Sequence, residues 1–185
     1  MYTNYETCLL KIARDAIQEK YTGQSLIDTS EIFKQYPDLT EPGAVFITIT
    51  KDNQLRGCIG SIQRYRSLLD DIRENSKSAA FKDPRFSPLE PDELNEIKIE
   101  ISILSASQPL NYQSVEELKT KIKPATDGII LTKDYHKAVF LPQVWEKLSR
   151  FDEFFESLCK KAGLSSNCLT DKPQIELFTV TTISE

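Results

Sequence analysis

The stretch Leu55-Arg56-Gly57-Cys58-Ile59-Gly60-Ser61 decides how the rest of the chain is interpreted. It places two glycines, a thiol and a guanidinium inside what otherwise has the pattern of a β-strand. Glycines weaken a strand interior, so they are expected at a bulge, at a bend, or where a backbone or ligand comes close. The stretch predicts either a β-bulge or barrel corner with Cys58 as a small buried hydrophobe, or a binding site.

The flanking residues place this stretch in the second arm of a β-hairpin. From Ala44 to Thr50 apolar and hydroxyl side chains alternate with frequent β-branching, and Asp52-Asn53-Gln54 turns the chain into the arm Leu55 to Ile62. A second hairpin is expected from Gly128 to Leu141, with its turn at Lys133-Asp134-Tyr135-His136.

Helical spacing of apolar residues predicts an amphipathic helix from Glu6 to Tyr21, ended by Gly23. A second helix is expected to begin at Ser67. Its apolar stripe ends in the small residues Ala79 and Ala80, so another segment can approach the helix closely there. The other expected segments are an ordered connection (Ser25 to Gly43), a loop closed by two prolines (Phe81 to Leu89), short helices (Ser114 to Ile122, Pro142 to Leu148, Asp152 to Ala162), strands (Ile97 to Ile103, Ile175 to Ile183) and a connector (Leu104 to Asn111).

Both halves of the chain follow the order hairpin, helices, strand. Each hairpin turn contains Lys-Asp, at Lys51-Asp52 and at Lys133-Asp134. This parallel indicates an internal structural duplication.

Composition excludes several classes of protein. With 185 residues, 39% of them hydrophobic, the chain is expected to form one full core or two small, intimately packed lobes. A net charge of −5 and the lack of a basic stripe argue against nucleic acid as a partner. The N-terminal residues lack the pattern of a signal peptide and no apolar run is long enough to span a membrane, so we expect a cytoplasmic protein.

The four cysteines are Cys8, Cys58, Cys159 and Cys168. They show no CxxC spacing, and in a reducing compartment they are most simply interpreted as free thiols. The chain has one histidine, His136, and its acidic residues are dispersed, so no metal site is predicted.

Four segments resemble the AMMECR-type domain, which is protein A of the AmmeMemoRadiSam system in bacteria and archaea. They are Leu55-Arg56-Gly57-Cys58-Ile59-Gly60, Ala79-Ala80-Phe81-Lys82-Asp83-Pro84-Arg85-Phe86-Ser87-Pro88-Leu89, Asp127-Gly128-Ile129-Ile130-Leu131 and Leu141-Pro142-Gln143-Val144. Their order and spacing match the family over nearly the whole chain. The sequence departs from the family at the turn Lys133-Asp134-Tyr135-His136-Lys137, where glycine and arginine are usual, so no role is carried over to that turn.

The resemblance implies an α+β fold. In it, two hairpin, helix and strand halves share one barrel-like, largely antiparallel sheet flanked by helices, as a single domain over residues 1–185 or two intimately packed lobes. It also implies association with a Memo-type protein, which resembles non-haem-iron extradiol dioxygenases, and with a radical SAM protein. The family has no settled reaction, so the resemblance assigns neither an activity nor a cofactor.

Cys58 is the candidate nucleophile, because a nearby cation turns a thiol into a reactive thiolate. On a regular strand Arg56 would share its face at about 6–7 Å and activate the thiol, or bind a carboxylate or phosphate. The alternative is an unreactive buried thiol, since His136 in its expected turn offers no Cys–His pair.

Four further residues complete the candidate binding site. Gly57 and Gly60 are expected to supply a positive φ or a close approach to a ligand, and they lack the spacing of a phosphate-binding loop. Asp83 and Arg85 either join Arg56 or Glu100 in a charged pocket floor, or pair with each other to fix their loop. Glu100 itself is interpreted as solvated or ion-paired, since a general base would need burial to raise its pKa.

Two functions follow from these residues. The first is a small-molecule-binding or enzymatic component with its pocket at Arg56, Gly57, Cys58 and Gly60, and with Asp83 and Arg85 nearby. The second is a non-catalytic interaction module that binds a partner protein through the same surface.

Overall fold

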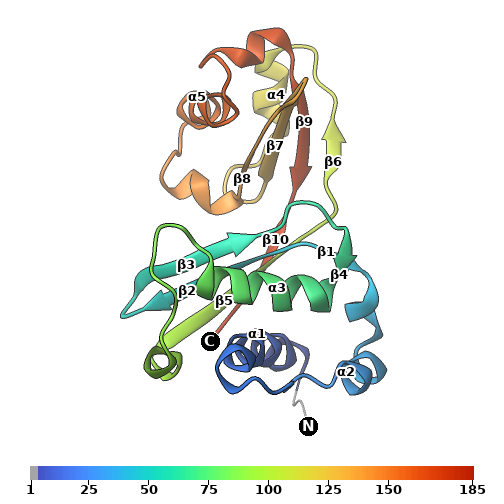
Figure 1. Ribbon diagram of the computed structural model, residues 1–185. Helices are drawn as coiled ribbons and strands as arrows, with labels where there is room; N and C mark the ends of the chain where they lie inside the picture. Colours follow the sequence, from blue (N-terminus) through green and yellow to red (C-terminus); the bar gives the residue numbers. More distant parts are fainter. Residues whose placement is uncertain (1–3) are drawn as a thin grey trace. The chain divides into compact units, whose positions relative to one another are not determined.

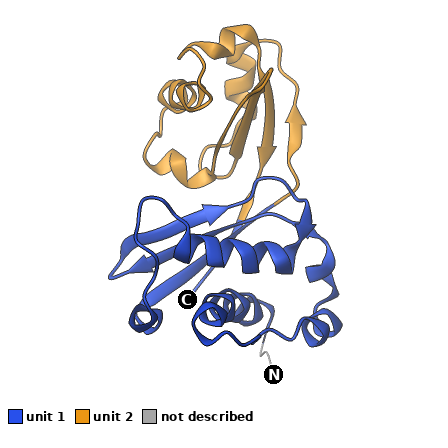
Figure 2. Cartoon of the chain, in the orientation of Figure 1, with its two compact units in different colours: residues 1–104, 181–185 blue, residues 105–180 orange. Residues whose placement is uncertain are grey.

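The computed structural model describes residues 4–185, and the chain forms two compact units (Figure 2). The first unit runs up to Leu104 and takes in Thr181–Glu185, and the second comprises Ser105–Val180. Each unit has its own hydrophobic core.

The first unit combines helices with an antiparallel sheet (Figure 1). Its elements are α1 (Tyr5–Thr22), α2 (Thr29–Gln35), η1 (Pro37–Thr40), β1 (Pro42–Gly43), β2 (Val45–Lys51), β3 (Gln54–Gly60), β4 (Arg66–Ser67), α3 (Leu68–Phe81), η2 (Pro91–Asn95), β5 (Ile97–Leu104) and β10 (Val180–Ser184).

The two long helices begin and end where their capping residues predict. The side chain of Asn4 accepts the backbone N–H of Thr7 at 2.7 Å at the start of α1, and Gly23 ends it at φ 67°. Ser67 caps α3 in the same way by accepting the N–H of Asp70. These boundaries confirm both helices expected from the sequence.

The main sheet of the first unit has the strand order β10-β5-β2-β3, so β3 lies at an edge. One face buries the alternate isoleucines of β2 and β5 against α1 and α3, the two helices that Figure 1 shows on one side of the sheet. The opposite face carries the intervening residues, which are mostly half-buried and include Phe46, Thr48, Cys58 and Glu100. We call this second face the thiol face.

The pairing of β2 with β3 contains a β-bulge. Ile49 pairs with Gly57 and Thr50 pairs with Leu55, which leaves Arg56 as the additional residue. The expected bulge is therefore present, and Arg56 and Cys58 do not occupy positions two apart on a regular strand.

Neither glycine of this stretch has a positive φ, because Gly23 and Gly163 are the glycines with that conformation in residues 4–185. A Cβ added to Gly57 would lie 2.2 Å from the backbone oxygen of Ala79, so the edge of the sheet presses against α3 where the helix has small residues. At Gly60 the obstacle is the ring of Phe46, at 2.3 Å. Both close approaches are made by the protein itself, which corrects the expectation of a positive φ.

The second unit has a sheet of order β6-β9-β7-β8. Its elements are β6 (Gln108–Leu110), α4 (Val115–Lys121), β7 (Gly128–Lys133), β8 (His136–Phe140), η3 (Pro142–Glu146), α5 (Phe151–Lys161), η4 (Cys168–Asp171) and β9 (Gln174–Phe178). Aromatic rings dominate its core, where Trp145 stacks on Phe154 with ring centroids 3.6 Å apart.

The fold class is confirmed as α+β, and the expected duplication is visible in the strand orders β5-β2-β3 and β9-β7-β8. The prediction of a single barrel-like sheet is wrong, because the described strands form two separate four-stranded sheets and the small β1–β4 pair. One edge strand of each sheet comes next in the chain after a strand of the other sheet: β6 comes after β5, and β10 comes after β9. The last strand is consequently not continuous from Ile175 to Ile183, and the expected connector contains β6.

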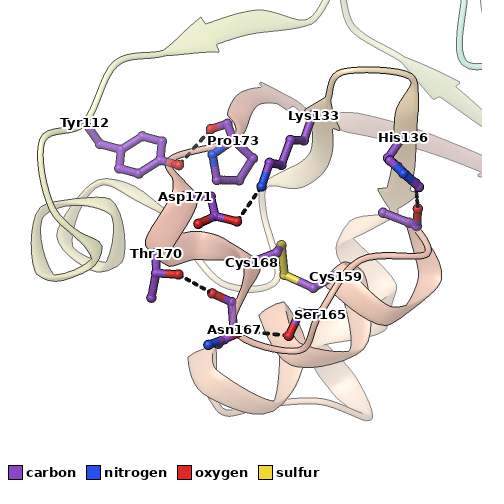
Figure 3. Close-up of a disulfide and its surroundings, with 11 residues drawn as sticks. Tyr112, Lys133, His136, Cys159, Ser165, Asn167, Cys168, Thr170, Asp171 and Pro173 are labelled. Carbon is purple, nitrogen blue, oxygen red and sulfur yellow. Dashed lines mark hydrogen bonds and ion pairs between the residues drawn. A yellow bond between two sulfur atoms is a disulfide. The ribbon is translucent and has the colours of Figure 1, made fainter.

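The expectation of four free thiols is also wrong. Cys159 and Cys168, which are nine residues apart, form a disulfide, while Cys8 and Cys58 are free (Figure 3). Both bonded cysteines are buried in the core of the second unit.

Candidate functional site

Cys58 is a half-buried free thiol on the edge strand β3. Its side chain is bound by Thr48, whose hydroxyl donates to the sulfur at an Oγ1–Sγ distance of 3.5 Å. The other free thiol, Cys8, is fully buried in α1, and burial raises its pKa to about 11. Cys58 is therefore the better placed of the two free thiols for contact with a ligand.

The backbone of Cys58 is held by the loop that follows α3. A carboxylate oxygen of Asp83 accepts the N–H of Cys58 at 2.9 Å, and the guanidinium of Arg85 donates to the Cys58 carbonyl at 3.2 Å. These contacts satisfy the outward-facing backbone groups that an edge strand leaves unpaired. The loop thus closes the edge of the sheet at the thiol.

Asp83 and Arg85 also bind each other through two hydrogen bonds of 2.7 and 2.9 Å. The guanidinium holds the pKa of the Asp83 carboxyl well below its usual range, and the pKa of Arg85 rises in turn. The Asp83 side chain is 2% exposed and that of Arg85 is 54% exposed. Of the two arrangements left open by the sequence, this is the one in which the residues pair and fix their loop.

Arg56 turns away from the thiol and binds the segment before β5. Its Nε and Nη2 atoms donate to the two carboxylate oxygens of Glu93 at 3.0 and 2.8 Å, and the guanidinium also donates to the carbonyls of Ser87 and Pro88. Arg56 lowers the pKa of Glu93 to about 2. The guanidinium that was expected beside Cys58 is thus fully engaged elsewhere.

Glu100 lies on the thiol face and forms no hydrogen bond or ion pair with Asp83 or Arg85. Thr48 pairs in register with Cys58 of β3 on one side and with Glu100 of β5 on the other. The three residues form a row of thiol, hydroxyl and carboxylate across neighbouring strands. Within residues 4–185 Glu100 has no ion pair, so the ion-paired interpretation is not the one found.

A buried polar network beside this sheet was not expected from the sequence. Asp71 of α3 is fully buried and accepts hydrogen bonds from the Val45 N–H, the Ser61 hydroxyl, Arg66 and Asn75. The network ties the start of β2 and the end of β3 to the helix. The sequence could have indicated this network, because Asp71 and Asn75 are polar residues one helical turn apart on the apolar side of α3, next to Ile72.

The second unit contains a hollow of about 400 Å³ next to β6 and β9. Its wall includes Tyr112, Lys172, Pro173 and Glu176, and the Tyr112 hydroxyl donates to the Pro173 carbonyl at 2.7 Å. Figure 3 shows this contact near the Cys159–Cys168 disulfide, with Lys133 and Asp171 paired beside it. No predicted site residue lines the hollow.

Residues 4–185 contain no group of three or more histidine, cysteine or acidic side chains able to hold a metal ion. None of the helices there is long and apolar enough to cross a membrane.

Comparison with known proteins places the chain in a family. The AMMECR1 family model matches residues 10–183. A protein of Methanothermobacter thermautotrophicus is 36% identical over 179 residues, covering 92% of this chain and 88% of the relative. Protein TV1384 of Thermoplasma volcanium is 40% identical over 160 residues, covering 85% of this chain and 77% of the relative.

A solved structure supports the same assignment. The crystal structure of the uncharacterized protein PH0010 from Pyrococcus horikoshii has a TM-score of 0.82 and 30% sequence identity, and the match covers 95% of this chain and 88% of that one. The chain belongs to the AMMECR1 family.

Proposed function

We propose that this protein is a small-molecule-binding or enzymatic component whose site is centred on Cys58. The single observation that carries the proposal is a free, half-buried thiol whose backbone N–H and carbonyl are bound by Asp83 and Arg85. A fixed reactive group loses little entropy when a ligand binds, which favours recognition and reaction.

The other predicted residues have supporting roles in this proposal. Gly57 brings the edge strand against α3, Gly60 accommodates the Phe46 ring, and Arg56 anchors the strand to Glu93. These contacts set the position of Cys58 without contributing a free ligand-binding group. The proposed ligand contacts are therefore the thiol face and the exposed part of Arg85.

Thiol labelling tests the proposal. The native protein is treated with iodoacetamide, a neutral reagent, and intact mass reports the number of labels. We expect one label, at Cys58, at a rate that increases with pH as the thiolate forms, while Cys8 stays unlabelled. The Cys58→Ser variant should take no label, and labelling of Cys58 only in denaturant would overturn the proposal.

A matched variant tests the role of the hydroxyl next to the sulfur. Thr48→Val keeps the shape of the side chain but removes the donor that reaches Cys58 at 3.5 Å. Because that donor stabilises the thiolate, we expect labelling at a fixed pH to slow about two- to fivefold, the effect of one ordinary hydrogen bond. An unchanged rate would show that the hydroxyl has no part in the site.

We also propose that this component acts with a Memo-type protein and a radical SAM protein. The alternative function is a non-catalytic module that binds such a partner, and it is favoured by the exposed guanidinium of Arg85, which lies 5.5 Å from the centre of the Phe86 ring. Pull-down of the purified partners separates the two functions. If the protein is an adaptor, Arg85→Glu abolishes partner binding and Cys58→Ala leaves it intact. If it is a thiol-centred component, Cys58→Ala abolishes ligand binding or reaction at this site.

A further inference from the structure

The hollow next to β6 and β9 lies within the second unit and is lined by none of the residues of the Cys58 site. Its volume of about 400 Å³ is at the lower end of the range for small-molecule sites. One wall comes from the end of β6 and the residues that follow it, and the other from the start of β9 and the residues that precede it.

The two walls are joined to each other. The Tyr112 hydroxyl of one wall donates to the Pro173 carbonyl of the other at 2.7 Å (Figure 3). Leu110 also pairs in register with Ile175, where the two strands reach the hollow. A site that is already formed loses little entropy when a ligand binds.

The segment that leads into the second wall is held in place as well. It is the short helix η4, which the Cys159–Cys168 disulfide ties to α5 and the Lys133–Asp171 ion pair ties to β7 (Figure 3). Lys172 ends this helix in the left-handed conformation, at φ 50° and ψ 58°. The position of its backbone is therefore set by contacts on both sides.

Lys172 brings an unpaired positive charge to the hollow. Its side chain forms no hydrogen bond or ion pair within residues 4–185. The neighbouring carboxylate, Asp171, is bound by Lys133. The ammonium of Lys172 is thus available to an anion.

The other polar side chains of the hollow limit the charge of that anion. Asn111 and Gln174 are exposed, and their amides have no partner in the described part of the chain, so each can donate to a bound oxygen. Glu176 is also in the wall, where its carboxylate accepts the Ser107 hydroxyl. One ammonium with one carboxylate nearby suits a single negative charge, whereas Glu176 would repel a phosphate dianion.

The rest of the lining is apolar and suits the body of a small molecule. It consists of Pro109, Leu110, Pro173, Ile175 and the Tyr112 ring. Pro109 and Pro173 have no N–H, so the walls offer few backbone donors to an added β-strand. These features favour a small molecule over an extended peptide.

We propose that the hollow binds small monocarboxylates with an apolar body. Lys172 pairs with the carboxylate, and the amides of Asn111 and Gln174 donate hydrogen bonds to it. This site is separate from that of Cys58, so the proposal goes beyond the function proposed above and does not depend on it.

Three probes of matched shape test the proposal: benzoate, benzamide and benzamidinium, which are anionic, neutral and cationic. Each is titrated into the ¹⁵N-labelled full chain at low ionic strength, and NMR shifts of the backbone N–H groups report where and how tightly it binds. We expect benzoate to shift the signals of Asn111, Lys172 and Gln174, and to bind at least about fivefold more tightly than the other two probes. Added salt should weaken benzoate binding, because the ammonium is exposed.

A matched pair of variants tests the role of the charge. Lys172→Gln should weaken benzoate binding about five- to tenfold, to the level of benzamide. Lys147→Gln removes another exposed lysine of the second unit, which lies outside the hollow and has no side-chain partner within residues 4–185, and it should leave the affinity unchanged. The NMR spectra of the free variants confirm that both are folded.

The proposal is overturned if benzoate shifts none of the signals of the hollow, or if Lys172→Gln binds benzoate as tightly as the wild type. Equal affinities for benzoate and benzamide would overturn it too, because the hollow would then not select an anion. None of these results bears on the thiol-centred function, which is tested at Cys58.

Discussion

The carboxylate of Asp83 accepts the backbone N–H of Cys58 at 2.9 Å, in the place that a further strand would occupy at the edge of the sheet. The same carboxylate is bound by Arg85, whose guanidinium donates to the Cys58 carbonyl. An ion pair thus replaces a neighbouring strand at one residue and protects an edge that would otherwise pair with another chain.

Asp83→Asn should lower the free energy of unfolding at pH 7 by about 2–4 kcal/mol, because it removes a buried charge and leaves Arg85 partly unpaired. The pKa of Asp83 is depressed on folding, so its contribution is present above about pH 4, its unfolded value, and is lost as pH falls further. The wild type should therefore lose stability in acid faster than the variant. Urea unfolding at pH 7 and pH 3 measures both effects, with the exposed Asp92→Asn as control.

Gly57→Ala should destabilise the protein more than Gly60→Ala. A methyl group on Gly57 meets the backbone oxygen of Ala79 at 2.2 Å, and that oxygen moves only if α3 moves. On Gly60 the obstacle is the Phe46 ring, a side chain that can rotate. We expect the free energy of unfolding to fall by about 3 kcal/mol or more in Gly57→Ala and by about 1–2 kcal/mol in Gly60→Ala, the range found for overpacking. Equal urea midpoints for the two variants would contradict this explanation of the glycines.

The sequence predicted the elements of the fold but not the connections that depend on distant partners. The end of the first helix at Gly23 and the start of the second at Ser67 follow from local capping chemistry, so they were visible in the chain. The change of sheet after Phe178 was not, because the sheet that a strand joins depends on distant pairing partners and not on the residues of the strand itself. The disulfide was missed for a similar reason, since a separation of nine residues is no recognised spacing and depends on where α5 ends.

The candidate site shows the same limit. The motif around Cys58 was found from its composition, and the contacts of Asp83 with Arg85 were among the arrangements considered. The prediction that Arg56 lies beside Cys58 was wrong, because the bulge depends on the register of β3 against β2 and cannot be recognised from the residues of β3 alone. The row of Cys58, Thr48 and Glu100 likewise exists only once three strands have been aligned.

Reduction of the Cys159–Cys168 disulfide should destabilise the second unit. The bond closes a loop with a sequence separation of nine residues, and loop-closure entropy gives about 2–3 kcal/mol for such a loop. Thiol titration in denaturant should find two free thiols before reduction and four after it. Dithiothreitol should lower the unfolding midpoint of the wild type and leave that of the Cys159→Ala, Cys168→Ala double variant unchanged.

Arg56 and Glu93 should show strong energetic coupling, because both side chains are only 15% exposed and meet through two parallel hydrogen bonds. A double-mutant cycle with Arg56→Gln and Glu93→Gln should give a coupling of about 1–3 kcal/mol at pH 7. Arg56→Lys should recover only part of the stability, since an ammonium cannot bind both oxygens and the two carbonyls in the same geometry.

The coupling should also disappear in acid. Folding lowers the pKa of Glu93 from 4.5 to about 2, so the pair contributes fully above about pH 5 and progressively less between pH 4.5 and pH 2. Repeating the cycle at pH 3 should give a smaller coupling energy than at pH 7, whereas a pair held only by neutral contacts would give the same value at both. Lys51 also reaches Glu93, at 3.4 Å, so Lys51→Met is the matched control: it removes a neighbouring charge but should leave most of the Arg56 coupling in place.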